Sequence, residues 1–198
     1  MSNNEASRNI YLMTKSLLEV SSSVVKLLQE VESILIEPCG DCPSFGLWPD
    51  GTYGYASMAL NNPKNRLTEF YGCAFTLASN EKIIAPSRDE LFVTVLAQFY
   101  HPELIQQAEL WFAVCRKTTT DKPTPVWWLR ADGHRNWETK KLPEYGKWLK
   151  NSVTSYGKEL MAFEVSRQPL GIFTGRQPLI DMIANPLRDK IVELSKRK

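Results

Sequence analysis

Residues 10–36 read IYLMTKSLLEVSSSVVKLLQEVESILI, and the spacing of their apolar side chains predicts a long amphipathic helix. The apolar positions follow one another at intervals of three or four residues, and they are Ile10, Met13, Leu17, Val20, Val24, Leu27, Val31 and Ile34. Such positions form one stripe along a helix of about 3.6 residues per turn. Ser2 with Glu5 matches a capping box, and Pro38 removes a backbone donor, so we expect the helix to occupy residues 1–38.

The width of this stripe distinguishes two kinds of packing. A coiled coil has a narrow seam flanked by charged residues, whereas the positions beside this seam are threonine and serine. Four further apolar residues widen the stripe, namely Leu18, Val25, Leu28 and Leu35. A wide stripe favours packing on a sheet or on several helices. We therefore expect the helix to cover the rest of the chain and to provide an oligomerisation or partner surface, with a homo-oligomer, such as a homodimer, as the expected assembly.

The composition is that of an ordinary folded protein. Of the 198 residues, 43% are hydrophobic and 23% are charged, which allows a buried core and excludes the disordered and fibrous classes. No apolar run approaches the roughly 20 residues of a membrane-spanning helix, and residues 1–9 lack the basic and apolar regions of a secretory signal. We therefore expect a cytoplasmic protein without membrane contacts, whose four cysteines are thiols.

Residues 39–198 are expected to form an α+β domain that folds as one unit with the N-terminal helix. Runs rich in aromatic and β-branched residues predict strands at 52–60, 66–79, 108–117, 124–132 and 159–166. Turn residues separate the first two runs and predict an antiparallel meander, and the short polar segment between the next two predicts a second hairpin. Strands joined by short turns imply a mainly antiparallel sheet.

Three further helices are predicted in this domain. One covers residues 87–100, where Ser87 and Glu90 match a capping box, another covers residues 142–155, and the third follows Gln177, with residues 167–175 as a loop before it. The expected fold class is therefore α+β, with a long N-terminal amphipathic helix followed by a mainly antiparallel sheet of about five strands and helices packed on one face.

Cys39 and Cys42 form a CxxC motif within the segment PCGDCP. This spacing lets both sulfurs face one metal ion, with zinc as the expected metal, or face each other. Any further ligands would have to be Cys73, Cys115, His101 or His134. The motif follows a helix, whereas a thioredoxin-like thiol pair begins one. A turn with incidental cysteines is the favoured interpretation, and a zinc site and a regulatory thiol are the alternatives.

Residues 127–150 interleave aromatic rings with cations, a combination that suits phosphates and unstacked bases. The charge of the chain is asymmetric, since residues 116–198 hold seventeen Lys and Arg against nine Asp and Glu. The candidates for ligand or nucleic-acid binding are Arg130, His134, Arg135, Trp137, Lys140 and Lys141. The alternative is that the tryptophans are core residues and the lysines form an ordinary solvated face.

Standard catalytic motifs are missing from the sequence, which has no GxxxxGK, no GxSxG and no HExxH. We therefore expect a non-enzymatic binding or regulatory domain that recognises a ligand or a protein partner. A nucleic-acid-binding protein that uses the basic C-terminal half is one alternative. A metal-dependent hydrolase is the other, with its carboxylates drawn from Glu109, Asp132, Glu159 and Glu164.

Overall fold

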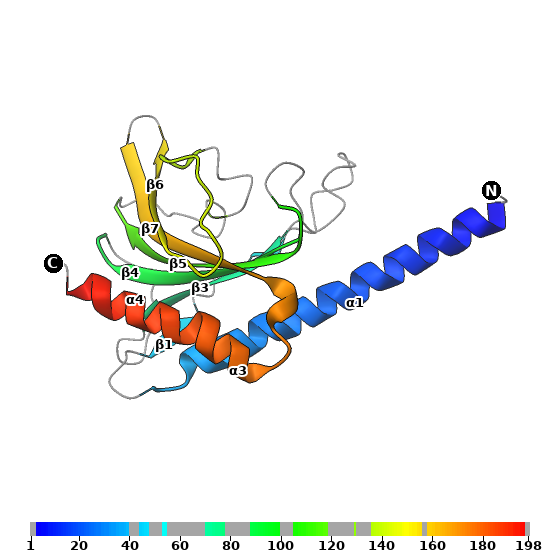
Figure 1. The fold of residues 1–198 in the computed structure, drawn as a ribbon, viewed down its shortest axis with the longest axis horizontal. Helices are drawn as coiled ribbons and strands as arrows, with labels where there is room; N and C mark the ends of the chain where they lie inside the picture. Colours follow the sequence, from blue (N-terminus) through cyan, green and yellow to red (C-terminus); the bar gives the residue numbers. More distant parts are fainter. Residues whose placement is uncertain are drawn as a thin grey trace.

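The chain folds into helices that lie on one face of an antiparallel sheet (Figure 1). The computed structural model describes residues 3–39, 44–47, 53–54, 70–77, 88–99, 105–118, 129, 136–155 and 158–196. The predicted α+β class and the antiparallel sheet are confirmed. Among the described residues, no helix combines the length and the apolarity needed to cross a membrane.

The sheet has seven strands within the described part of the chain. They are β1 Phe45–Leu47, β2 Tyr53–Gly54, β3 Phe70–Leu77, β4 Leu91–Gln98, β5 Glu109–Lys117, β6 Leu149–Ser155 and β7 Lys158–Pro169. Their order is β1-β3-β4-β5-β7-β6, and β2 pairs with β3 off this path. Every pair is antiparallel. The pairing of β2 with β3 confirms that the first two predicted strands are antiparallel neighbours, while the predicted turn between them lies outside the described residues.

The central strands are buried on both faces because they separate two hydrophobic cores. Successive side chains of a strand point to opposite faces. On β5, Phe112 and Val114 therefore pack against the helices, whereas Trp111 and Cys115 belong to the core on the other face. The same alternation leaves β4 apolar at nearly every position, as is usual for a strand that is covered on both sides.

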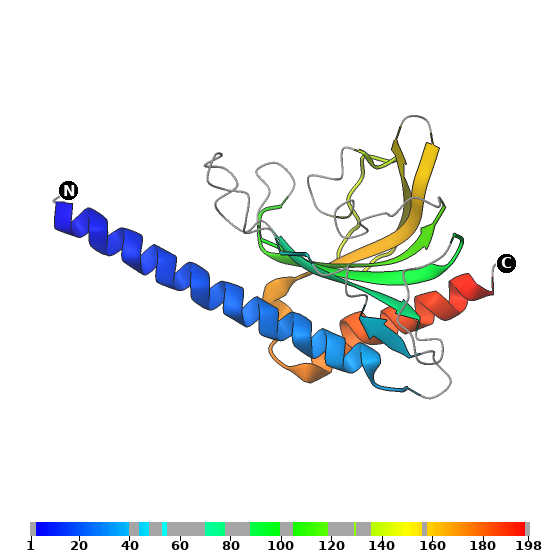
Figure 2. The same ribbon diagram turned by 180° about the vertical axis from the view of Figure 1, so that it is seen from behind.

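The helix layer combines the two ends of the chain. Helix α1 covers Asn3–Ile36, and the C-terminal helical segments are η4 Leu170–Ile172, α3 Arg176–Leu179, the π-helical turn η5 Ile180–Ala184, and α4 Asn185–Ser195. The α1 side chains in the core are Val24, Leu28, Val31, Ile34 and Leu35. Towards its N-terminus, α1 extends well beyond the sheet (Figure 2).

The helix predicted at residues 87–100 is wrong, because residues 91–98 form strand β4. Burial on both faces removed the alternation of polar and apolar residues that normally marks a strand. The apolar positions of β4 then also match helical spacing. The β-branched and aromatic residues that favour a strand were the better guide.

The helix predicted at residues 142–155 is also wrong. Residues 149–155 form β6, which pairs with β7, and residues 142–148 are not helical. Within the described part of the chain, β6 pairs with β7 along its whole length, and this cross-strand pairing decides its conformation against the local helical spacing.

The hairpin predicted between residues 108–117 and 124–132 is wrong, because both edges of β5 are occupied by β4 and β7. Strand β7 is also longer than predicted, since it includes residues 167–169 of the expected loop. The helical structure predicted after Gln177 is confirmed, and Asn185-Pro186 marks the point where the π-helical turn gives way to α4. Proline is tolerated there because the first turn of a helix leaves backbone donors unpaired.

Candidate functional site

The outer half of α1, which we define as residues 3–23, carries large apolar side chains in solvent. The exposed fractions are 67% for Tyr11, 48% for Leu12 and 49% for Val20. Val24, one helical turn after Val20, is only 4% exposed because it packs into the core between the helices and the sheet. The side chains at Ile10, Met13, Leu17 and Leu18 lie outside the described residues. The apolar stripe therefore leaves the sheet between Val20 and Val24.

The basic and aromatic segment at residues 127–150 is only partly described. Arg130, His134 and Arg135 lie outside the described residues. Trp137 is 1% exposed, and its ring packs 5.0 Å from that of Phe163 and 5.9 Å from that of Trp111, measured between centroids. A ring buried in this way has no face open to stack on a base. Trp137 is a core residue.

Lys140 and Lys141 lie on the surface, three and four residues after the buried Trp137. The structure thus places the two lysines in solvent and the tryptophan ring in the core. It does not combine them in an open site where a base could stack beside a phosphate contact.

Only one cysteine of the CxxC motif, the exposed Cys39, lies in the described part of the chain, and Cys42 lies outside it. Cys73 packs against the core between the helices and the sheet, whereas Cys115 is in the core on the opposite face of the sheet. These two thiols therefore cannot ligate one metal ion together. In the described residues, no group of three or more His, Cys, Asp or Glu side chains is placed to hold a metal.

Burial keeps both internal thiols protonated. The pKa of Cys73 is raised to about 11, first by burial and then by the negative charge of Glu32. Burial also raises the pKa of the fully enclosed Cys115 far above its ordinary value. Since the thiolate is both the metal ligand and the nucleophile, these two cysteines are suited to neither role at neutral pH.

A polar cluster is buried at one end of β5, around the carboxylate of Glu109, which is 1% exposed. Glu109 accepts hydrogen bonds from the Trp111 indole at 2.7 Å, from the Tyr145 hydroxyl at 2.6 Å and from the Arg167 guanidinium at 3.1 Å. Arg167 also donates to the backbone carbonyl of Pro143 at 2.7 Å. The cluster holds residues 143–145 against β7, and its carboxylate is fully occupied by structural partners.

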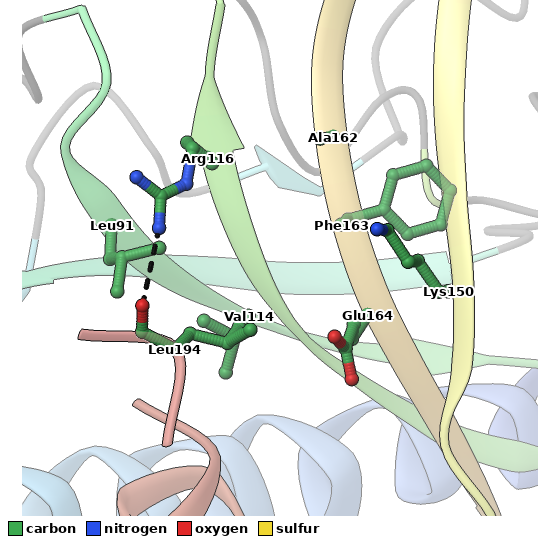
Figure 3. Close-up of a pocket in the computed structure, with 8 residues that line it drawn as sticks. All are labelled: Leu91, Val114, Arg116, Lys150, Ala162, Phe163, Glu164 and Leu194. Atoms are coloured by element: carbon green, nitrogen blue, oxygen red, sulfur yellow. Dashed lines mark hydrogen bonds between the residues drawn. The ribbon is translucent and has the colours of Figure 1, made fainter. Parts of the chain in front are cut away.

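A pocket of about 360 Å³ opens where α4 ends over the sheet (Figure 3). Its lining comes from β4, β5, β6, β7 and α4, and comprises Leu91, Val114, Arg116, Lys150, Ala162, Phe163, Glu164 and Leu194. The volume falls within the range of small-molecule sites. This pocket was not predicted from the sequence. Arg116 was nevertheless a usable signal, because it continues the inward-facing series of β5 formed by Leu110, Phe112 and Val114.

Comparison of the chain with protein-family models, with curated proteins and with solved structures finds no match. Function must therefore be inferred from the chain's own residues. The described residues offer two surfaces for this purpose. One is the outer half of α1, and the other is the pocket beside the end of α4.

Proposed function

We propose that this protein is a non-enzymatic binding domain that self-associates through the outer half of α1. The observation that carries the proposal is the contrast between Val20 and Val24. Both belong to one apolar stripe, yet Val20 is 49% exposed and Val24 is 4% exposed. The sequence thus continues a core-forming pattern beyond the point where the chain's own core ends.

The stability of the outer half supports the same proposal. Most of the stability of a helix in a protein comes from packing of its apolar face rather than from helix propensity. On the N-terminal side of Val24 the helix continues through residues 3–23, and the stripe residue Val20 is exposed there. A partner that covers the stripe would contribute roughly 25 cal/mol for each Å² of apolar surface that it buries.

Charge favours a second copy of the chain as the partner. Residues 3–23 contain two acidic and two basic side chains, Glu5, Glu19, Arg8 and Lys15, so two such segments do not repel each other. A two-fold arrangement places the same patch on both subunits and needs no further surface. The acidic N-terminal part and the basic C-terminal part of the chain nearly balance, so the net charge is +2. Two copies of the chain therefore repel each other only weakly.

The test is the oligomeric state of the full chain, measured by light scattering coupled to size exclusion. The wild type is expected to be a dimer at micromolar concentration. Val20→Asp is expected to weaken the dimer roughly tenfold or more, because an unpaired carboxylate would be buried at the interface. Since Val20 is exposed within one chain, the variant should keep the thermal unfolding of the monomer.

Ser22→Asp is the matched control, because it adds the same charge nearby, on an exposed residue that lies off the stripe. It should leave the dimer intact. A monomeric wild type would overturn self-association, and so would equal dissociation of the dimer in the two variants.

A further inference from the structure

The pocket beside α4 arises from strand register and from the point at which α4 ends. Two rows of directly opposed residues cross the sheet on the face that the helices cover. One row runs from Leu91 through Arg116 to Ala162, and the next from Val114 through Glu164 to Lys150. Helix α4 ends at Ser195, so the last turn of the helix, with Leu194, forms one wall of the cavity. The cavity therefore lies over the part of this sheet face that extends beyond the end of α4.

Two of its cations have no carboxylate partner among the residues that the structure describes. Arg116 donates to the backbone carbonyls of Asp89 at 3.3 Å and Leu194 at 3.4 Å, and neither of these partners is a carboxylate. Lys150 is exposed on β6. Figure 3 shows Arg116 and Lys150 on opposite sides of the cavity. An anion between them would meet a positive group from either side.

The acidic side chain of the pocket is paired with a lysine. The carboxylate of Glu164 lies 3.0 Å from the Lys190 ammonium, which also contacts Glu193 at 2.7 Å and lies 5.2 Å from the ring centroid of Trp148. Among the described residues that line the pocket, two are cations, Arg116 and Lys150, and one is a carboxylate, Glu164. The local field favours a negatively charged ligand.

The remaining walls are apolar. Leu91, Val114, Ala162 and Leu194 supply aliphatic surface beneath the two cations. Small-molecule sites combine an apolar lining with a few polar groups that orient the ligand, and this cavity has that composition. The geometry points to a binding site for a small organic carboxylate, whose charged group lies between Arg116 and Lys150 and whose apolar body contacts Leu91, Val114 and Leu194.

Isothermal titration calorimetry on the full chain tests this site with octanoate as the probe. Octanol and octylammonium have the same apolar body without the negative charge, and they are expected to bind far more weakly. Lys150→Gln should weaken octanoate binding roughly threefold to fivefold, as expected for the loss of one exposed ion pair. Lys141→Gln removes an equal charge from an exposed position that does not line the pocket and should leave binding unchanged.

Ala162→Leu separates the pocket from general electrostatic attraction, because it fills the cavity and leaves both cations in place. It should abolish octanoate binding, with thermal unfolding as the check that the variant is folded. The proposal is overturned if octanoate does not bind the wild type, if octanol binds equally well, or if folded Ala162→Leu binds octanoate as the wild type does. If Ala162→Leu fails to fold, the comparison of Lys150→Gln with Lys141→Gln tests the site instead, and equal octanoate binding by these two variants would overturn the proposal.

Discussion

The guanidinium of Arg188 on α4 donates a hydrogen bond of 2.7 Å to the backbone carbonyl of Ile34, near the end of α1. The same nitrogen donates to the carbonyl of Glu37 at 3.0 Å. The last carbonyls of a helix have no partner within the helix and carry partial negative charge. Arg188 is 5% exposed, so a buried cation from the C-terminal helix caps the N-terminal one.

Arg188→Gln should therefore destabilise the whole fold by about 1–3 kcal/mol, because it leaves buried carbonyls without a donor. The measurement is the free energy of unfolding in urea. Arg176→Gln is the matched control, since Arg176 bonds the side chains of Glu30 and Glu37 of the same region from an exposed position. Exposed ion pairs contribute little. Equal destabilisation by the two variants would contradict the capping role of Arg188.

Arg167→Met should lower the free energy of unfolding by more than the loss of an ordinary surface charge does. It would leave the buried carboxylate of Glu109 without its cation, which lies 3.1 Å away, and breaking a buried pair in this way costs about 3–5 kcal/mol. Glu109→Gln leaves Arg167 its bond to Pro143, so a smaller loss is expected. Urea unfolding of both variants gives the comparison, and a stable Arg167→Met protein would count against it.

Alkaline pH should reduce the stability that the cluster around Glu109 contributes. The pKa of Tyr145 is raised above its ordinary value, first by burial and then by the hydrogen bond to Glu109. The folded protein thus keeps the phenol proton more strongly than the unfolded chain does. The resulting stability is fully present below about pH 10 and is lost as the pH rises through the folded pKa.

Tyr145→Phe should remove this part of the alkaline decline, which can be followed as the unfolding temperature against pH. The difference in tyrosinate absorbance between wild type and variant reports the titration of Tyr145 directly. Titration at or below the ordinary pKa of tyrosine would show that the hydroxyl is not held by Glu109.

The three described cysteines should react with iodoacetamide in the order Cys39, Cys73, Cys115. Cys39 is exposed, whereas Cys73 has a pKa of about 11 and Cys115 is enclosed in the core. At neutral pH the lower thiolate fraction of Cys73 alone should slow its reaction roughly tenfold or more. Mass spectrometry of labelled peptides measures each rate, with urea-unfolded protein as the control. Labelling of native Cys115 as fast as Cys39 would contradict its burial.

Local patterns predicted the elements whose burial is one-sided or whose side chains favour one conformation. The stripe of α1, the strands containing Trp111 and Phe163, and the helical C-terminus follow from periodicity and composition. The strands β4 and β6 did not, because β4 is covered on both faces and β6 depends on its partner β7. In both segments, apolar spacing compatible with a helix was overridden by pairing across the sheet.

The amino-acid sequence by itself determined that an apolar stripe runs along α1, and that Arg116 interrupts an otherwise apolar face of β5. Only the tertiary structure decided where that stripe leaves the core, between Val20 and Val24, and which residues surround Arg116. The physical reason is that strand register and the end of α4 bring Arg116 of β5 together with Lys150 and Glu164, which lie much later in the chain. Such a juxtaposition has no periodic signal in the sequence.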